Sequence, residues 1–234
     1  MENTIPSRLR SAVAAAPRFV GAGPPDRRRS LERYGAMAEA YDKTTRGGHY
    51  YRRQAVARLA PMPGEVILDV GCGTGLNFAA LRHAIGPTGR LIGVEHSPET
   101  LGLARARIAS HGWTNVEIVQ ADAGEAAIDV MADGALLCAV HDVMRSPAAL
   151  VNVLRHLRDR ARVVAGGPKW APLGAGGALS MNFRTWRMNR PCVTTFEGFR
   201  QPWSYLELLV DNLVVDEVFL GGGYIASGTR PRTR

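Results

Sequence analysis

The stretch VILDVGCGTGLNF, residues 66–78, constrains the fold more than any other part of the chain. Its apolar start predicts a buried strand, the three glycines that follow predict a tight turn, and the residues after them predict a helix. This order is typical of α/β proteins that bind nucleotides. The dinucleotide fingerprint requires the spacing G-x-G-x-x-G, but Leu76 takes the place of its third glycine. No Gly-Lys-Ser/Thr follows either, which disfavours a P-loop.

The segments after this turn alternate between short apolar runs and longer amphipathic ones. Ser97-Pro98 and Ser146-Pro147 both pair a capping serine with a proline at the first helical position, which predicts two helix starts. The alternation predicts a doubly wound, mostly parallel sheet. We expect strands at 65–70, 90–95, 115–120, 134–140 and 161–166, helices at 31–43, 49–60, 77–86, 98–112, 147–160 and 202–213, and a terminal antiparallel hairpin over 213–228.

The formal net charge of +8 lies mostly at the two ends of the chain. Residues 1–30 hold six Arg against two acids, and the last five residues hold three Arg, which leaves +1 for the body. A nucleic-acid partner is therefore not expected, because such binders carry their basic residues on a folded face. We divide the chain into a flexible basic segment (1–29), one folded domain (30–228) and a basic tail (229–234).

Three cysteines, Cys72, Cys138 and Cys192, form no C-x-x-C pair. Neither a zinc site nor a disulfide framework is expected, and a cytoplasmic location fits best. No apolar run reaches the roughly 18–20 residues of a membrane span, so no stable membrane insertion is expected. The sequence leaves the oligomeric state open, a homodimer included.

Acidic residues stand at the ends of the first three predicted strands. Asp69 ends the first strand, Glu95 ends the second, and Asp122 follows the third. The carboxyl ends of parallel strands meet at one edge of a sheet, so these carboxylates and the glycine turn should face one ligand. A carboxylate at the position of Glu95 can accept hydrogen bonds from both ribose hydroxyls.

Together these residues resemble the class I S-adenosylmethionine-dependent methyltransferases over residues 30–228. The resemblance implies a Rossmann-like seven-stranded sheet in which the turn binds the methionine end, Glu95 binds ribose and Asp122 meets adenine. AMAEAYDK at 36–43 is similar to an N-terminal helix of the quinone-biosynthesis methyltransferases, which implies that Tyr41 lies over the sulfonium. Ordinary helix packing explains Tyr41 equally well. The cofactor-binding residues so expected are Tyr41, Asp69, Gly71, Gly73, Gly75, Asn77, Glu95, His96, Asp122 and Ala123.

His141 follows the fourth predicted strand in CAVHDVMRSP and is the candidate general base. The alternative is a structural histidine at the end of the strand. Asp142 is not expected to orient it, because adjacent residues on an extended segment point to opposite sides. No set of carboxylates follows the fourth and fifth strands, so we predict no metal ligands.

In the resembling family, the N-terminal helices (here 30–60) and the insert after the fifth strand (here 167–205) select the acceptor. From these we take Tyr34, Trp186 and Trp203 as candidate substrate residues, since tryptophans stack on planar or sugar-like groups; core packing is the alternative. Arg184, Arg187 and Arg190 recur every three residues and either recognise an acidic group or form a solvated face.

The sequence therefore predicts a methyltransferase that acts on a small molecule. The leading hypothesis is O-methylation of a hydroxyl on a phenol or quinol, a glycoside or another secondary metabolite. C-methylation of a quinone-like ring and a non-catalytic S-adenosylmethionine-binding module remain as alternatives.

Overall fold

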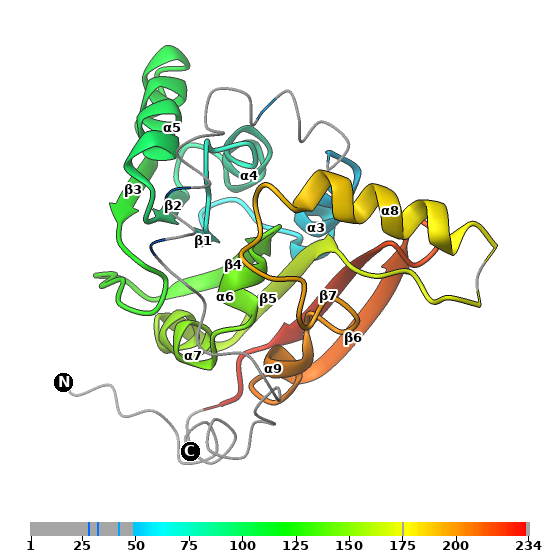
Figure 1. Ribbon diagram of the computed structural model, residues 1–234. Helices are drawn as coiled ribbons and strands as arrows, with labels where there is room; N and C mark the ends of the chain where they lie inside the picture. The colour runs from blue at the N-terminus through cyan, green and yellow to red at the C-terminus, as the bar shows by residue number, and fades with distance from the viewer. Residues whose placement is uncertain (1–27, 29–31, 33–41, 43–48, 175, 233–234) are drawn as a thin grey trace.

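A computed structural model describes residues 28, 32, 42, 49–174 and 176–232. Its centre is one seven-stranded sheet of order β3-β2-β1-β4-β5-β7-β6 (Figure 1). Strands β1 to β5 pair in parallel, and β7 runs antiparallel to both β5 and β6. The strands are β1 (Val66–Val70), β2 (Arg90–Glu95), β3 (Val116–Gln120), β4 (Ala132–Cys138), β5 (Leu157–Pro168), β6 (Asp211–Val218) and β7 (Gly223–Thr229). The predicted doubly wound sheet with a terminal antiparallel hairpin is confirmed.

Successive residues of a strand point to opposite faces, and this alternation divides the core into two layers. Ile67 packs with buried residues of α3 (His49–Leu59), α4 (Phe78–Ile85) and α5 (Pro98–Ser110), whereas Leu68 packs with those of α6 (His141–Met144), α7 (Pro147–Arg155) and α9 (Ser204–Glu207). The sheet is thus covered on both faces, as its apolar central strands require. The helix α8 (Ala178–Asn189) follows β5 in the chain.

Both helix starts predicted from a serine–proline pair are present. The hydroxyl oxygen of Ser97 accepts a hydrogen bond from the amide of Thr100, and that of Ser146 accepts one from the amide of Ala149 at 3.2 Å. Each contact satisfies one of the amides that the first turn of a helix leaves without a partner. These caps fix where α5 and α7 begin.

Two predicted helices are shorter than expected. The helix expected over 147–160 ends at Arg155, because Leu157 already pairs with Ala132 in the sheet. The helix expected over 202–213 is limited to α9, because Asp211 pairs with Thr229 of β7. In both places, pairing with the sheet outweighs helical periodicity.

The insert after β5 contains one helix, α8, as expected. Most of the predicted helix over 31–43 lies outside the described residues, which include only residues 32 and 42 of it; the segment 1–27, Tyr34 and Tyr41 lie outside them too. None of the helices in the described part of the chain is long and apolar enough to cross a membrane.

Candidate functional site

The glycine turn follows β1, where the strand order reverses between β2 and β4. Gly71 has φ +65°, and a Cβ there would lie 2.3 Å from Cγ1 of Val140. Gly73 has φ +55°, but a Cβ there would meet no described atom within 4 Å. Gly71 therefore serves the packing of the turn against the end of β4, whereas Gly73 leaves open space above the backbone.

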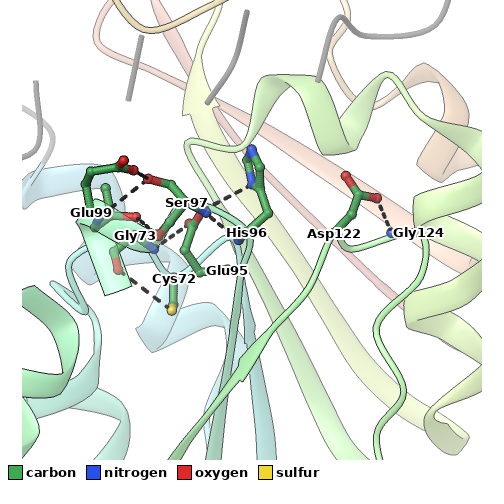
Figure 2. Close-up of polar contacts among 9 residues, drawn as sticks. Cys72, Gly73, Glu95, His96, Ser97, Glu99, Asp122 and Gly124 are labelled. Atoms are coloured by element: carbon green, nitrogen blue, oxygen red, sulfur yellow. Dashed lines mark hydrogen bonds and ion pairs between the residues drawn. The ribbon is translucent and has the colours of Figure 1, made fainter. Parts of the chain in front are cut away.

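Glu95 lies at the end of β2 and binds the same turn (Figure 2). Its Oε2 accepts a hydrogen bond from the amide of Gly73 at 3.0 Å. Its Oε1 accepts hydrogen bonds from the amides of His96 at 2.8 Å and Ser97 at 2.9 Å. Burial alone would raise the pKa of Glu95, but hydrogen bonds from His96, Ser97 and Gly73 outweigh it and lower the pKa. The buried group is therefore a carboxylate at neutral pH, with lone pairs that can accept from hydroxyls.

Asp69 and Asn77 form a buried pair below the turn. The amide nitrogen of Asn77 donates to both carboxyl oxygens of Asp69, at 3.1 and 3.3 Å. Burial raises the pKa of Asp69 to about 7, against the lowering effects of the Asn77 hydrogen bond and the Arg52 charge. The Oδ1 atom of Asn77 is buried and has no hydrogen-bond partner among the described residues. This oxygen can accept a hydrogen bond from a cationic or amino group of a ligand.

Arg52 is a residue of this region that the sequence reasoning did not single out. It projects from α3 and is 6% exposed, and its positive charge opposes the rise that burial causes in the pKa of both Asp69 and Cys138. The only signal in the sequence is a pair of arginines in a helix with a low apolar content. Its burial depends on how α3 packs against the sheet.

His96, Asp122 and Ala123 lie at the neighbouring strand ends. The side chains of His96 and Asp122 project from the same edge of the sheet in Figure 2. Nδ1 of His96 lies 3.2 Å from Oε1 of Glu95. Oδ1 of Asp122 accepts a hydrogen bond from the amide of Gly124 at 2.8 Å, and the buried Ala123 accepts one through its carbonyl from Asn152 at 2.8 Å. The structure therefore brings the described cofactor candidates to one edge.

Asp42, which directly follows Tyr41, contacts the turn from outside. Oγ1 of Thr74 donates to Oδ1 of Asp42 at 2.6 Å. Arg107 of α5 donates both to the carbonyl of Thr74 and to Oδ2 of Asp42. The residue next to the predicted sulfonium-binding tyrosine is thus held against the glycine turn.

His141 begins α6, just after β4, and is 8% exposed. Its Nε2 lies 2.8 Å from the carbonyl oxygen of Glu197, so this nitrogen carries the proton and donates it. The ring also makes an edge contact with Phe199, with 4.3 Å between the ring centroids. Burial lowers the pKa of His141 to about 4, with a smaller effect of the same sign from Arg145. The imidazole is therefore neutral at pH 7.

Asp142 does not pair with His141 and instead accepts a hydrogen bond from Oγ1 of Thr194 at 2.8 Å. Arg145 forms an ion pair with Glu197 at 3.3 Å. Together with the His141 contact, these two contacts join α6 and the residue after it to residues 194–197 of the insert. No group of three or more His, Cys, Asp or Glu side chains in the described residues could hold a metal ion.

Trp186 and Trp203, two of the candidate substrate residues, line one cleft of about 1050 Å³ beneath α8. The other residues of its lining are Lys169, Trp170, Ala171, Pro172, Leu173, Asn182, Phe183, Arg200, Gln201 and Glu217. Asn182 fixes one wall, because its side chain bonds both the amide and the carbonyl of Ala171, at 2.7 and 3.1 Å.

Residues 62–193, more than half of the chain, match the family described as "Methyltransferase domain". The chain belongs to the methyltransferase domain family. It is a class I S-adenosylmethionine-dependent methyltransferase domain, and its cofactor is S-adenosylmethionine. The open space above Gly73, the unpartnered Oδ1 of Asn77 and the ionised Glu95 fit a ligand with an amino group and a ribose.

Two sequence relatives and one solved structure illustrate how far this likeness extends. A demethylmenaquinone methyltransferase of Symbiobacterium thermophilum is 27% identical over 83% of this chain and 84% of its own length. An uncharacterised 37.1 kDa protein in transposon Tn4556 of Streptomyces fradiae is 33% identical over 56% of this chain, but the match spans only 38% of that protein. A methyltransferase structure from Aquifex aeolicus superimposes with a TM-score of 0.59 at 15% identity, covering 84% of this chain and 98% of that one.

Proposed function

We propose that the domain transfers a methyl group from S-adenosylmethionine to a hydroxyl oxygen of a small-molecule acceptor, with His141 as the general base. The observation that carries this proposal is the buried, neutral imidazole of His141 at the carboxyl end of β4. Ligands of such sheets bind at the carboxyl ends of the strands. A base placed there can reach an acceptor next to the cofactor.

S-adenosylmethionine supplies an electrophilic methyl group on a sulfonium. We expect Asn77 and Asp69 to hold the methionine end, and Glu95 to accept hydrogen bonds from the ribose hydroxyls. His96, Asp122 and Ala123 would border the adenine, and Tyr41 would lie over the sulfonium. In this proposal the helices within 30–60 and the insert 167–205 enclose the acceptor.

The base step follows from the tautomer of His141. Because Nε2–H donates to the carbonyl of Glu197, the lone pair of Nδ1 is the one that accepts the proton of the acceptor hydroxyl. The imidazole would carry a positive charge once Nδ1 holds the proton of the acceptor hydroxyl. The burial that keeps the ring neutral also makes it a weaker base, so the proton transfer has to accompany the methyl transfer.

Steady-state kinetics with labelled S-adenosylmethionine and a panel of phenols, quinols and glycosides test this proposal. His141→Ala should lower kcat by about 10²-fold or more, with unchanged cofactor affinity. His83→Ala on the exposed side of α4 is the matched control and should keep the full rate. A near-native kcat for His141→Ala would exclude His141 as the base.

A second candidate is C-methylation of a quinone-like ring. It is supported by the long alignment with the Symbiobacterium demethylmenaquinone methyltransferase. There the ring carbon is the nucleophile, and the loss of His141 should matter less. The chemical shift of the transferred methyl distinguishes O-CH3 from C-CH3. Cofactor binding that Glu95→Ala abolishes, without methyl transfer to any acceptor, would instead indicate a non-catalytic binding module.

A further inference from the structure

The cleft beneath α8 adjoins a smaller hollow of about 300 Å³. Trp170, Arg200 and Gln201 line both spaces. The smaller hollow is also lined by Phe199, whose ring contacts His141 at 4.3 Å and Trp170 at 5.4 Å between centroids. The smaller hollow therefore lies one aromatic ring, Phe199, away from the proposed base, and Trp170 connects it to the larger cleft.

Aromatic rings form much of the wall of the larger cleft. Phe183 and Trp186 of α8 lie 5.9 Å apart, and Trp203 packs against Tyr224 of β7 at 5.2 Å. Trp170 is backed by Phe196 in a stacked arrangement at 5.1 Å. Such walls offer flat apolar faces on which a planar ring can stack.

The charges of the lining do not balance. Lys169 is 2% exposed and is neutralised, because its Nζ contacts Oε1 of Glu217 at 2.9 Å and the carbonyl of Gly221 at 3.1 Å. Arg200 is exposed, and no carboxylate in the described residues lies within ion-pair distance of it. One positive charge therefore remains in the lining, beside the side-chain amide of Gln201.

The arginines in and directly after α8 do not supply this charge. Arg184 and Arg187 are absent from the lining of both spaces. The guanidinium of Arg190 lies 4.8 Å from the centre of the Trp186 ring, on which it stacks. Of the two alternatives that the sequence left open for these exposed arginines, their positions fit the solvated face, and Arg200 is the arginine in the cleft.

We propose that the cleft binds a planar aromatic ring that carries a carboxylate, with the ring between the tryptophans and the carboxylate on Arg200. Guanidinium and carboxylate form paired, charge-assisted hydrogen bonds. This inference rests on the proposed function, since it names aromatic acids as the acceptor class of the same enzyme.

Calorimetry on the full chain with 1-naphthoate and 1-naphthamide tests the inference, because the two probes share a shape and differ in charge. We expect 1-naphthoate to bind the wild-type protein about 10-fold more tightly or better. Arg200→Gln should abolish this preference while leaving the affinity for S-adenosylmethionine unchanged. Arg53→Gln, an exposed arginine of α3, is the matched control and should retain it.

Equal affinity for the two probes, binding of neither, or a preference that survives Arg200→Gln would overturn the inference. So would a preference that is lost in Arg187→Gln instead, since the anion site would then lie on the exposed face of α8. Trp186→Ala should weaken both probes. The binding measurement needs no turnover, so a failure of the proposed methyl transfer would be seen separately, in the labelled-donor assay.

Discussion

Nε2 of His141 lies 2.8 Å from the carbonyl oxygen of Glu197, a residue 56 positions further along the chain. This contact fixes the tautomer of the ring and joins the carboxyl end of β4 to the insert that borders the cleft. The insert and the proposed base are therefore mechanically connected. The burial that creates this contact also has a measurable effect on stability.

The pKa of His141 is lowered to about 4 from an ordinary value of 6.5. Between these values the unfolded chain binds a proton that the folded protein does not, so stability falls as the pH drops from about 6.5 to 4. His141→Gln, whose amide can still donate to Glu197, should lose less stability over this window. Urea unfolding at pH 7 and pH 5 measures the difference. Equal losses in the two proteins would show that His141 titrates normally.

The pH dependence of stability that Asp69 causes has the opposite sign. Burial raises its pKa to about 7 from 3.8, so the folded protein holds a proton that the unfolded chain releases, and stability falls as the pH rises from about 4 to 7. Asp69→Asn removes this loss, and the variant should be more stable than the wild type at pH 8 but not at pH 4. Its affinity for S-adenosylmethionine should fall. Thermal unfolding at both pH values measures the stability effect, and titration calorimetry with S-adenosylmethionine measures the affinity. A variant that is less stable than the wild type at pH 8 would contradict the raised pKa of Asp69.

Gly71 and Gly73 should respond differently to the same substitution. Gly71→Ala places a methyl 2.3 Å from Val140 and should destabilise the fold by about 1–3 kcal/mol. Val140→Ala should restore part of that loss. Gly73→Ala meets no described atom, so it should cost only the backbone strain, about 1 kcal/mol, while cofactor affinity drops sharply. Chemical denaturation and calorimetry of both variants separate the roles, and intact affinity in Gly73→Ala would rule out its place under the cofactor.

The order of the strands and the glycine turn could be predicted from the sequence because they depend on local patterns, although β4 lies two residues before the expected 134–140 and β5 extends beyond the expected 161–166 at both ends. β2 falls at 90–95 as expected, since an apolar run there is bounded by turn residues on both sides. Ser97 and Ser146 fixed two helix starts for the same reason, because a cap acts within three residues.

Features that depend on contacts between distant segments could not be read in this way. The helix after Ser146 ends early because Leu157 finds a partner in β4, which periodicity does not reveal. The burial of Arg52, the contact between His141 and Glu197 and the position of Arg200 in the cleft all depend on packing. The regular spacing of Arg184, Arg187 and Arg190 left an anion site and a solvated face open, because helical spacing alone does not say which face meets a cavity.

The amide of Trp170 donates to the carbonyl of Phe199 at 2.8 Å, so the insert leaves the sheet and returns at almost the same point. A loop closed at its base can change in length and content while the strands on either side keep their register. The sheet and its cofactor site are thereby insulated from changes in α8 and the residues around it. Under the proposed function, acceptor choice is therefore a modular property: exchanging α8 would alter it, while Glu197, which fixes the tautomer of the proposed base, is the part of the segment that must stay.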